Sequence, residues 1–351
     1  MRKLNKLAAL ALSGCAINAH ATNGMNMEAW GAKSGGMGGA AYAFDTGNSA
    51  VMNNPATLGL KAPGEADLGL GLTLLMPDVS AGAGGFTADS DGTAYWMPTL
   101  SYIRRHDDLA MGVAMLAQGG MGTEYGSGSA LFARGCDSAS APGGCNPVAM
   151  SGGDIRSEVG FGRLMFPLAW NAGERLTLAG QLDLAWASMD LRMDMDGQSM
   201  AGMMAQGLAT TTLPLPPTIN YARFDFSDGN PMTGKAKSYG WGYKLGALWK
   251  VNDQFKLGAT YHAKTRMGDM KTDDARVIVN GGAMNGTLKV IDFQWPETYG
   301  LGIAYEGGGA WSWAADLKRI RWSDAMANFH MHFSNAAGEL DVTMPQNWKD
   351  Q

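Results

Sequence analysis

The chain has 351 residues, 46% of them hydrophobic and 17% charged, and its formal net charge is −5. A mildly acidic chain without long runs of lysine and arginine lacks the basic stripe of a nucleic-acid-binding protein, so no nucleic-acid partner is expected. Glycine occurs 50 times, well above its usual share of about 7%. This excess calls for a structural reason.

The amino terminus predicts a secretory signal peptide at residues 1–21. A cationic start is followed by an apolar stretch at 7–17 and by the small-residue cleavage site Ala19-His20-Ala21. We therefore expect the mature chain to begin at Thr22. An alternative stays open, because Leu12-Ser13-Gly14-Cys15 has the form of a lipoprotein box that would acylate Cys15.

Residues 22–61 show no regular alternation and are rich in glycine, alanine and methionine. With Trp30, Tyr42 and Phe44 among them, they are too apolar for a free tail, which would be polar and poor in aromatic residues. We predict that this segment plugs the inside of a barrel formed by the strands that follow. Its run Gly35 to Gly39 does not fit a phosphate-binding loop, because no strand leads into it and no Gly-Lys-Ser/Thr follows.

Apolar and polar or small residues alternate over most of the remaining chain, which is the pattern of β-strands. The clearest example is YGWGYKLGALWKV at 239–251, where every second residue is apolar or aromatic. No segment has the roughly 18 consecutive apolar residues of a membrane-spanning helix. The alternation predicts strands near 65–76, 94–105, 109–118, 157–170, 175–191, 237–251, 255–267, 287–305 and 311–322.

The connections between these strands differ in length. Tight polar or glycine-rich turns follow residues 105, 170, 251 and 305. The other connections, at 77–93, 119–156, 192–236, 268–286 and 323–346, are long. Short turns at one end and long loops at the other are typical of outer-membrane barrels, with the turns in the periplasm and the loops outside the cell.

We therefore predict an all-β fold for residues 62–351, a transmembrane antiparallel β-barrel in the outer membrane of a Gram-negative cell. The ring-bearing strand faces then contact lipid, with Tyr239 and Trp249 at headgroup level. The opposite faces line the lumen, and Lys256, Lys264 and Arg266 are expected there, because a cation at the bilayer midplane costs about 2 to 4 kcal/mol. A soluble β-sandwich, the alternative, would not usually place Tyr and Trp at strand ends.

The long loops hold further candidate residues. Cys136 and Cys145 flank a Gly/Pro/Ser-rich stretch, and an exported chain is in a compartment where disulfides persist, so we predict a disulfide between them. Methionines gather around the 192–236 loop, where flexible thioethers suit an adaptable apolar capture surface. Loose packing of the loop is the plainer interpretation. The candidate capture residues are Met200, Met203, Met204, Leu213 and Leu215.

Chemistry-bearing patterns are otherwise weak. His330 and His332 could ligate a metal, but no third ligand is near them in the sequence. No Gly-x-Ser-x-Gly elbow occurs. We predict no catalytic residue, no metal and no cofactor, and hence no enzyme.

Several motifs together resemble the FadL family of outer-membrane transporters for long-chain fatty acids and aromatic hydrocarbons. The matching segments are Ala21-Thr22-Asn23-Gly24, Gly36-Met37-Gly38-Gly39-Ala40, Asn54-Pro55-Ala56, VNDQFKLGATYHAKT (251–265), WPETYGLGIAY (295–305) and PQNWKD (345–350). The resemblance implies a barrel of about fourteen strands whose lumen is blocked by an amino-terminal hatch. It also implies that Gly36, Met37, Gly38, Asn54, Pro55 and Ala56 take part in gating.

This sequence departs from the family pattern by ending after about nine predicted strands. An open sheet would leave backbone groups unpaired in hydrocarbon at several kcal/mol each. We therefore expect these residues to be a piece of a longer protein.

The function implied is passive uptake of hydrophobic compounds, captured by the loops and gated by the hatch. Apolar solutes gain about 25 cal/mol per Å² on leaving water, so the channel needs no energy source. The expected partners are fatty acids or aromatic hydrocarbons, membrane lipid and lipopolysaccharide, and the channel is expected to be a monomer. A structural or receptor-type barrel that binds an external partner through its loops is the alternative.

Overall fold

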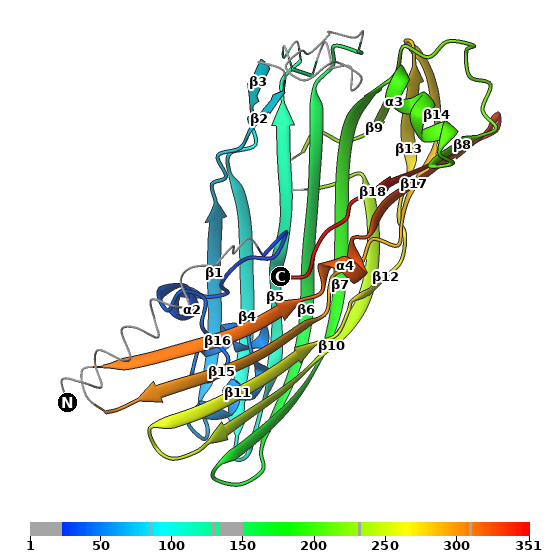
Figure 1. Cartoon of the computed structure of the whole chain (residues 1–351). Coiled ribbons are helices and arrows are strands. Elements are labelled where there is room, and N and C mark those ends of the chain that lie inside the picture. The colour runs from blue at the N-terminus through cyan, green and yellow to red at the C-terminus, as the bar shows by residue number, and fades with distance from the viewer. Residues whose placement is uncertain are drawn as a thin grey trace.

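A computed structural model describes residues 23–83, 86–127, 129, 131–132, 150–230, 233–308 and 311–351. In it, one long antiparallel sheet curves around the amino-terminal segment 23–61, which we call the hatch (Figure 1). The predictions on signal cleavage, on Cys15 and on the pair Cys136 and Cys145 fall outside these residues and stay predictions.

The main sheet contains sixteen strand segments. They are β1 (Ala66–Leu75), β4 (Tyr95–His106), β5 (Leu109–Tyr125), β6 (Ile155–Asn171), β7 (Leu176–Asp196), β8 (Ala209–Thr211), β9 (Tyr221–Phe226), β10 (Ala236–Lys250), β11 (Phe255–His262), β12 (Arg266–Met267), β13 (Met270–Val279), β14 (Gly282–Ile291), β15 (Thr298–Glu306), β16 (Ser312–Ile320), β17 (Asn328–Asn335) and β18 (Gly338–Pro345). A separate hairpin is formed by β2 (Ser80–Ala83) and β3 (Phe86–Asp89). The helical segments are α2 (Ala32–Gly36), η2 (Gly47–Val51), η3 (Pro55–Leu60), α3 (Gly197–Ala205) and α4 (Trp322–Ala325).

The wall has two parts that share β10. Strands β1, β4, β5, β6, β7 and β10 are neighbours in that order, and β11, β15 and β16 continue the sheet near the short turns. Near the long loops, β9 joins β7 to β13, and β14, β17, β18 and β8 follow. Among the described strands, β1 pairs with β4 alone and β16 with β15 alone.

Eight of the nine predicted strands are present, whereas the predicted strand at 287–305 is divided between β14 and β15. Two predicted long loops are also wrong. Residues 268–286 hold β13 and the start of β14, and residues 323–346 hold α4, β17 and β18. In these strands the apolar residues face the lumen and polar residues face outward, as in β13, where Met270, Val277 and Val279 are buried. A bulge between Thr272 and Ala275 also interrupts the alternation, so the pattern that marks the lipid-facing strands is absent. The 192–236 loop is also partly ordered, with α3, β8 and β9.

A β-bulge corrects the prediction for two lumenal cations. Between the pairs Lys244↔His262 and Trp241↔Arg266, the strand beside β10 holds one extra residue. One inserted residue reverses which face each following side chain occupies. Arg266 therefore lies outside the wall, with its guanidinium carbon 5.4 Å from the centre of the Trp241 ring. Lys264 lies beside it, whereas Lys256 is buried and pairs with Glu306.

The outer face of the wall carries the apolar and aromatic residues, as predicted. Tyr239 and Trp249 are both exposed, and leucines occupy the alternate positions of β7 and β10 between such rings. No helix among the described residues is long and apolar enough to cross a membrane.

Candidate functional site

The hatch is anchored to the inside of the wall through Asn54. Its side-chain nitrogen donates to the carbonyl of Tyr42 at 2.8 Å and to that of Ala247, on β10, at 3.0 Å. Its side-chain oxygen accepts from the amide of Ala56 and so caps η3. Because Asn54 is fully buried, all these bonds form away from water. The asparagine therefore ties two parts of the hatch to one wall strand.

Glycines of the wall let the hatch come this close. A Cβ atom on Gly246 would collide with Asn54, and one on Gly258 or Gly300 would collide with Tyr42. These glycines belong to β10, β11 and β15, so they form a smooth inner surface across three strands. The glycine excess in the sequence thus has a structural reason at this contact.

A cluster of charged and polar side chains on the wall forms hydrogen bonds to the hatch. The Lys244 ammonium donates to the Val51 carbonyl at 2.8 Å, and the side-chain amide of Gln181 donates to the same oxygen at 3.0 Å. The ring of His262 is hydrogen-bonded to the Asn53 carbonyl at 3.0 Å. Hatch carbonyls at the end of η2 and just after it are thus held by side chains of three different strands.

Arg163 completes this cluster. Its guanidinium forms an ion pair with Asp183 at 3.0 Å and donates to Gln118 and Thr265. Lys244 lies 3.5 Å from the same carboxylate. Two buried cations therefore share one buried carboxylate, which leaves an excess of positive charge at this level of the lumen.

Tyr42 fixes the opposite side of the hatch. The backbone amides of Ala41 and Tyr42 donate to the Asp316 carboxylate on β16, at 2.6 and 3.0 Å. Burial raises the pKa of the Tyr42 hydroxyl well above its usual value, and the negative charge of Asp316 adds to the shift. The hydroxyl therefore stays protonated at any physiological pH.

A small pocket lies between the hatch and the wall. Trp30 and Tyr42 of the hatch line it together with Arg163, His262 and Trp295 of the wall. The indole nitrogen of Trp295 and the amide of Gln118 both donate to the side-chain oxygen of Asn26. The pocket thus combines aromatic surface with polar groups and cations.

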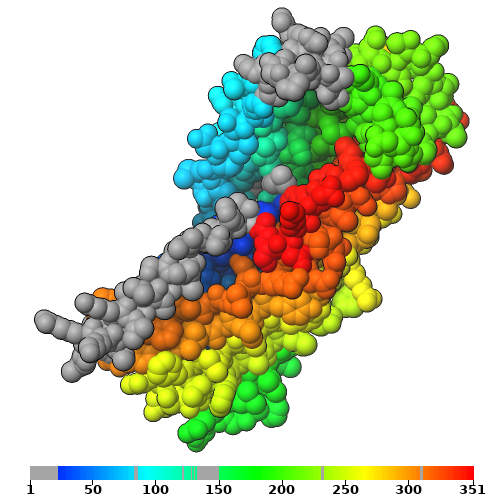
Figure 2. Space-filling view, in the orientation of Figure 1, coloured from blue at the N-terminus to red at the C-terminus, as the bar shows by residue number. Residues whose placement is uncertain are grey.

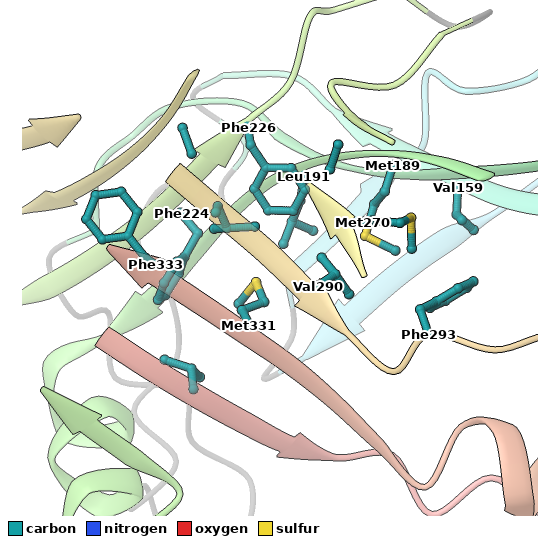
Figure 3. Packing of buried hydrophobic residues seen from close by; sticks show 14 of the residues in the cluster. Val159, Met189, Leu191, Phe224, Phe226, Met270, Val290, Phe293, Met331 and Phe333 are labelled. Atoms are coloured by element: carbon teal, nitrogen blue, oxygen red, sulfur yellow. The ribbon is translucent and has the colours of Figure 1, made fainter. Parts of the chain in front are cut away.

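Above the hatch, the lumen is filled by an apolar cluster that we call the outer apolar cluster (Figure 3). Its buried members come mainly from β6, β7, β9, β13, β14, β17 and β18, and reach down to Met25 of the hatch and Trp295. Labelled members in Figure 3 are Val159, Met189, Leu191, Phe224, Phe226, Met270, Val290, Phe293, Met331 and Phe333. A continuous apolar interior therefore runs from the long-loop end of the barrel to the hatch.

Comparison with protein families identifies the chain. The family model described as outer membrane protein transport protein (OMPP1/FadL/TodX) matches residues 168–351, more than half of the sequence. The chain belongs to this family. Membership confirms the predicted outer-membrane β-barrel fold, its location and the resemblance to FadL.

Solved structures of the FadL/TodX family have the same fold. The toluene transporter TodX of Pseudomonas putida is 29% identical, with a TM-score of 0.78 and coverage of 93% of this chain and 78% of that one. The toluene transporter TbuX of Ralstonia pickettii is also 29% identical, with a TM-score of 0.77 and coverage of 93% and 80%.

A shorter match links the chain to a protein of Chlorobium limicola, described as an uncharacterized protein in the phosphoenolpyruvate carboxykinase gene 5′ region. The two are 52% identical over 114 residues, which is 32% of this chain and 55% of that protein. This chain thus spans about half the length of that relative.

Within this FadL/TodX-family fold, the six predicted gating residues fall into two groups. Asn54, Pro55 and Ala56 are buried against the wall. Gly36 and Gly38 have no neighbouring atom within 4 Å of an added Cβ, and Met37 is 38% exposed. The second group touches the wall much less than the first.

The five predicted capture residues are brought together on the outer apolar cluster. Met200 and Leu213 are buried members of it, and Met203, Met204 and Leu215 pack against it half-buried. Their segment also closes on the barrel through β8, which pairs with β18. The rings of His330 and His332 both hydrogen-bond to Asp341. No group of three or more side chains suited to hold a metal occurs in the described part of the chain.

Sequence reasoning missed the charged wall cluster of Arg163, Asp183, Lys244 and His262. Each of these residues sits at an inward position between apolar outward neighbours, and this was the available signal. The partners could not be read from the sequence, because they depend on strand register and on where the hatch lies.

Proposed function

We propose that this protein is a passive channel for the uptake of hydrophobic compounds, either long-chain fatty acids or aromatic hydrocarbons. The continuous apolar interior from α3 to Met25 carries the proposal. An apolar solute gains about 25 cal/mol for each Å² removed from water on entering such a lining. Two structural relatives, TodX and TbuX, are toluene transporters, which adds support for aromatic substrates.

We further propose that capture starts at α3 and the segment after it. Met200 and Leu213 present apolar groups to the outer apolar cluster, and the methionines around them have flexible side chains that can repack around a solute. The cluster is closed by side-chain packing, so passage requires local rearrangement rather than an open pore.

The hatch is the proposed gate below the cluster. The bonds of Asn54 to β10 and of Lys244 to the Val51 carbonyl hold it in a closed position. The space-filling view shows the blue hatch only as a strip between the cyan-green wall and the orange-red segments (Figure 2). A solute that reaches the pocket at Trp30 and Tyr42 meets the excess positive charge near Arg163, which suits the carboxylate of a fatty acid.

Uptake by cells tests the proposal. A deletion strain would be complemented with the full-length gene and supplied with radiolabelled oleate or toluene. We expect faster uptake of at least one of them than in the strain without the gene, with no change for arabinose. Equal uptake with and without the gene would leave a structural or receptor barrel as the better account.

A loop variant locates the entry. Leu213→Asp puts a charge into the outer apolar cluster, and we expect it to lower uptake at least fivefold. Pro217→Asp adds the same charge at an exposed position of the same segment and serves as the matched control. Loss of uptake in both variants would contradict entry at Leu213.

A further inference from the structure

An open groove runs along the outer wall, on the side that contacts lipid. Alanines and glycines, including Ala247 and Ala259, form its floor, and Leu245, Leu301 and Leu317 form its sides. Across four strands, Leu245, Tyr261, Tyr299 and Arg319 lie opposite one another in register. The alanines and glycines between these larger residues leave a concave apolar surface at the depth of the lipid tails, which an acyl chain can fill.

A polar pocket adjoins this groove toward the long-loop end. Tyr243 and Tyr261 stand at the boundary, with ring centres 6.0 Å apart, and Lys264, Arg266 and Gln294 lie beyond them. Arg266 lies opposite Trp241, two residues from Tyr239, whose ring marks the headgroup level at the long-loop end. The bulge between His262 and Arg266 turns both cations outward at this level, although plain alternation would turn them into the lumen.

These two cations have no carboxylate partner among the described residues. Lys264 donates to the backbone carbonyl of Asp324 at 2.7 Å, and Arg266 stacks on Trp241. Asp292 lines the same pocket and forms no ion pair with either of them in the described part.

Nearby arginines are already neutralised. Arg319 pairs with Asp350 at 2.9 Å, and Arg321 pairs with Glu297 and Asp324. In the described part of the chain, Lys264 and Arg266 are thus the cations that offer unpaired positive charge at the rim of the groove.

We propose that this face binds the lipid A part of lipopolysaccharide, with an acyl chain in the groove and a phosphate on Lys264 and Arg266. The long-loop end of an outer-membrane barrel faces the outer leaflet, where lipopolysaccharide is found. Lysine and arginine bind phosphate through charge-assisted hydrogen bonds. A hydrocarbon leaving the channel would gain nothing from cations at this rim, so the charge favours an anionic amphiphile.

A binding measurement tests this site. The full-length protein in neutral detergent would be titrated with bis-phosphorylated lipid A and followed by native mass spectrometry. We expect the double variant Lys264→Ala/Arg266→Ala to raise the apparent Kd at least tenfold. The matched control Arg104→Ala/Arg175→Ala removes two exposed cations near the short turns and should change it less than twofold.

Two further arms separate the contributions. Ala259→Phe fills the floor of the groove and should also weaken binding of lipid A. Dephosphorylated lipid A lacks the groups that Lys264 and Arg266 bind, so it should bind the unchanged protein and the double variant equally. Heat-modifiable gel mobility checks that every variant is folded. Equal affinity of the double variant and the unchanged protein, or equal binding of both lipids, would overturn the proposal. Uptake of oleate and toluene should be the same for the double variant, which keeps this test separate from that of the channel.

Discussion

Gly246 is a wall residue against which the hatch packs closely, through Asn54. The glycine faces the lumen from β10, and Asn54, Pro55 and Ala56 lie directly against it. In the same sheet, Gly180 of β7 pairs with Leu245 on the outer face and has no atom near its missing Cβ. A methyl group thus fits at Gly180 but not at Gly246, although the two glycines are on neighbouring strands.

The substitution Gly246→Ala should loosen the hatch. The new methyl group cannot fit without moving Asn54, and such overpacking costs about 1 to 3 kcal/mol. We expect faster amide hydrogen exchange at Ala56 and Leu58, measured by mass spectrometry on the folded protein in detergent. Gly180→Ala is the matched control and should leave the exchange of these amides unchanged. Equal exchange in the two variants would argue against the hatch contact at Gly246.

At the scale of elements, α3 is a short helix whose stability comes from the outer apolar cluster. Asp196 caps it by accepting from the amide of Ser199, and Met200 buries its side chain in the cluster. An isolated helix of this length would not persist in water. Its position therefore depends on the packing of a few side chains.

The substitution Met200→Ala should release α3 from the barrel. Shortening a buried methionine to alanine typically costs 2 to 5 kcal/mol, because a cavity replaces packed atoms. We expect faster proteolytic cleavage between residues 197 and 213, followed by mass spectrometry of the fragments. Gln206→Ala, at an exposed position after the same helix, should cleave at the original rate. Unchanged cleavage of the Met200 variant would show that β8, rather than the helix packing, holds this segment.

The elements also show what the sequence could and could not predict. Strand β10 was predictable because lipid on one side and lumen on the other impose a strict alternation from Tyr239 to Trp249. Strand β13 was not, because its outward residues are mostly charged and a bulge between Thr272 and Ala275 interrupts the alternation. The bulge after His262 was hidden as well, since an extra residue leaves no mark in composition.

Some residues of the candidate site could likewise be predicted from the sequence, and others could not. The capture residues could be found because methionine and leucine cluster in one segment. The hydrogen bond from Lys244 to the Val51 carbonyl could not be predicted, because it joins residues 193 positions apart.

The whole molecule is organised by depth in the membrane, and a lysine at two depths tests this. Leu182 lies on the outer face of β7, about midway between the level of Trp249, which is opposite Leu176, and that of Trp186, whereas Tyr239 lies opposite Trp186. A lysine at the bilayer midplane costs about 2 to 4 kcal/mol, falling to about 0 to 1 kcal/mol at the interface. Leu182→Lys should therefore lower the free energy of unfolding from lipid vesicles by the larger amount, and Tyr239→Lys by the smaller, as measured by urea titration of tryptophan fluorescence. Equal losses for the two variants would mean that protein, and not hydrocarbon, covers the outer face of β7 at Leu182.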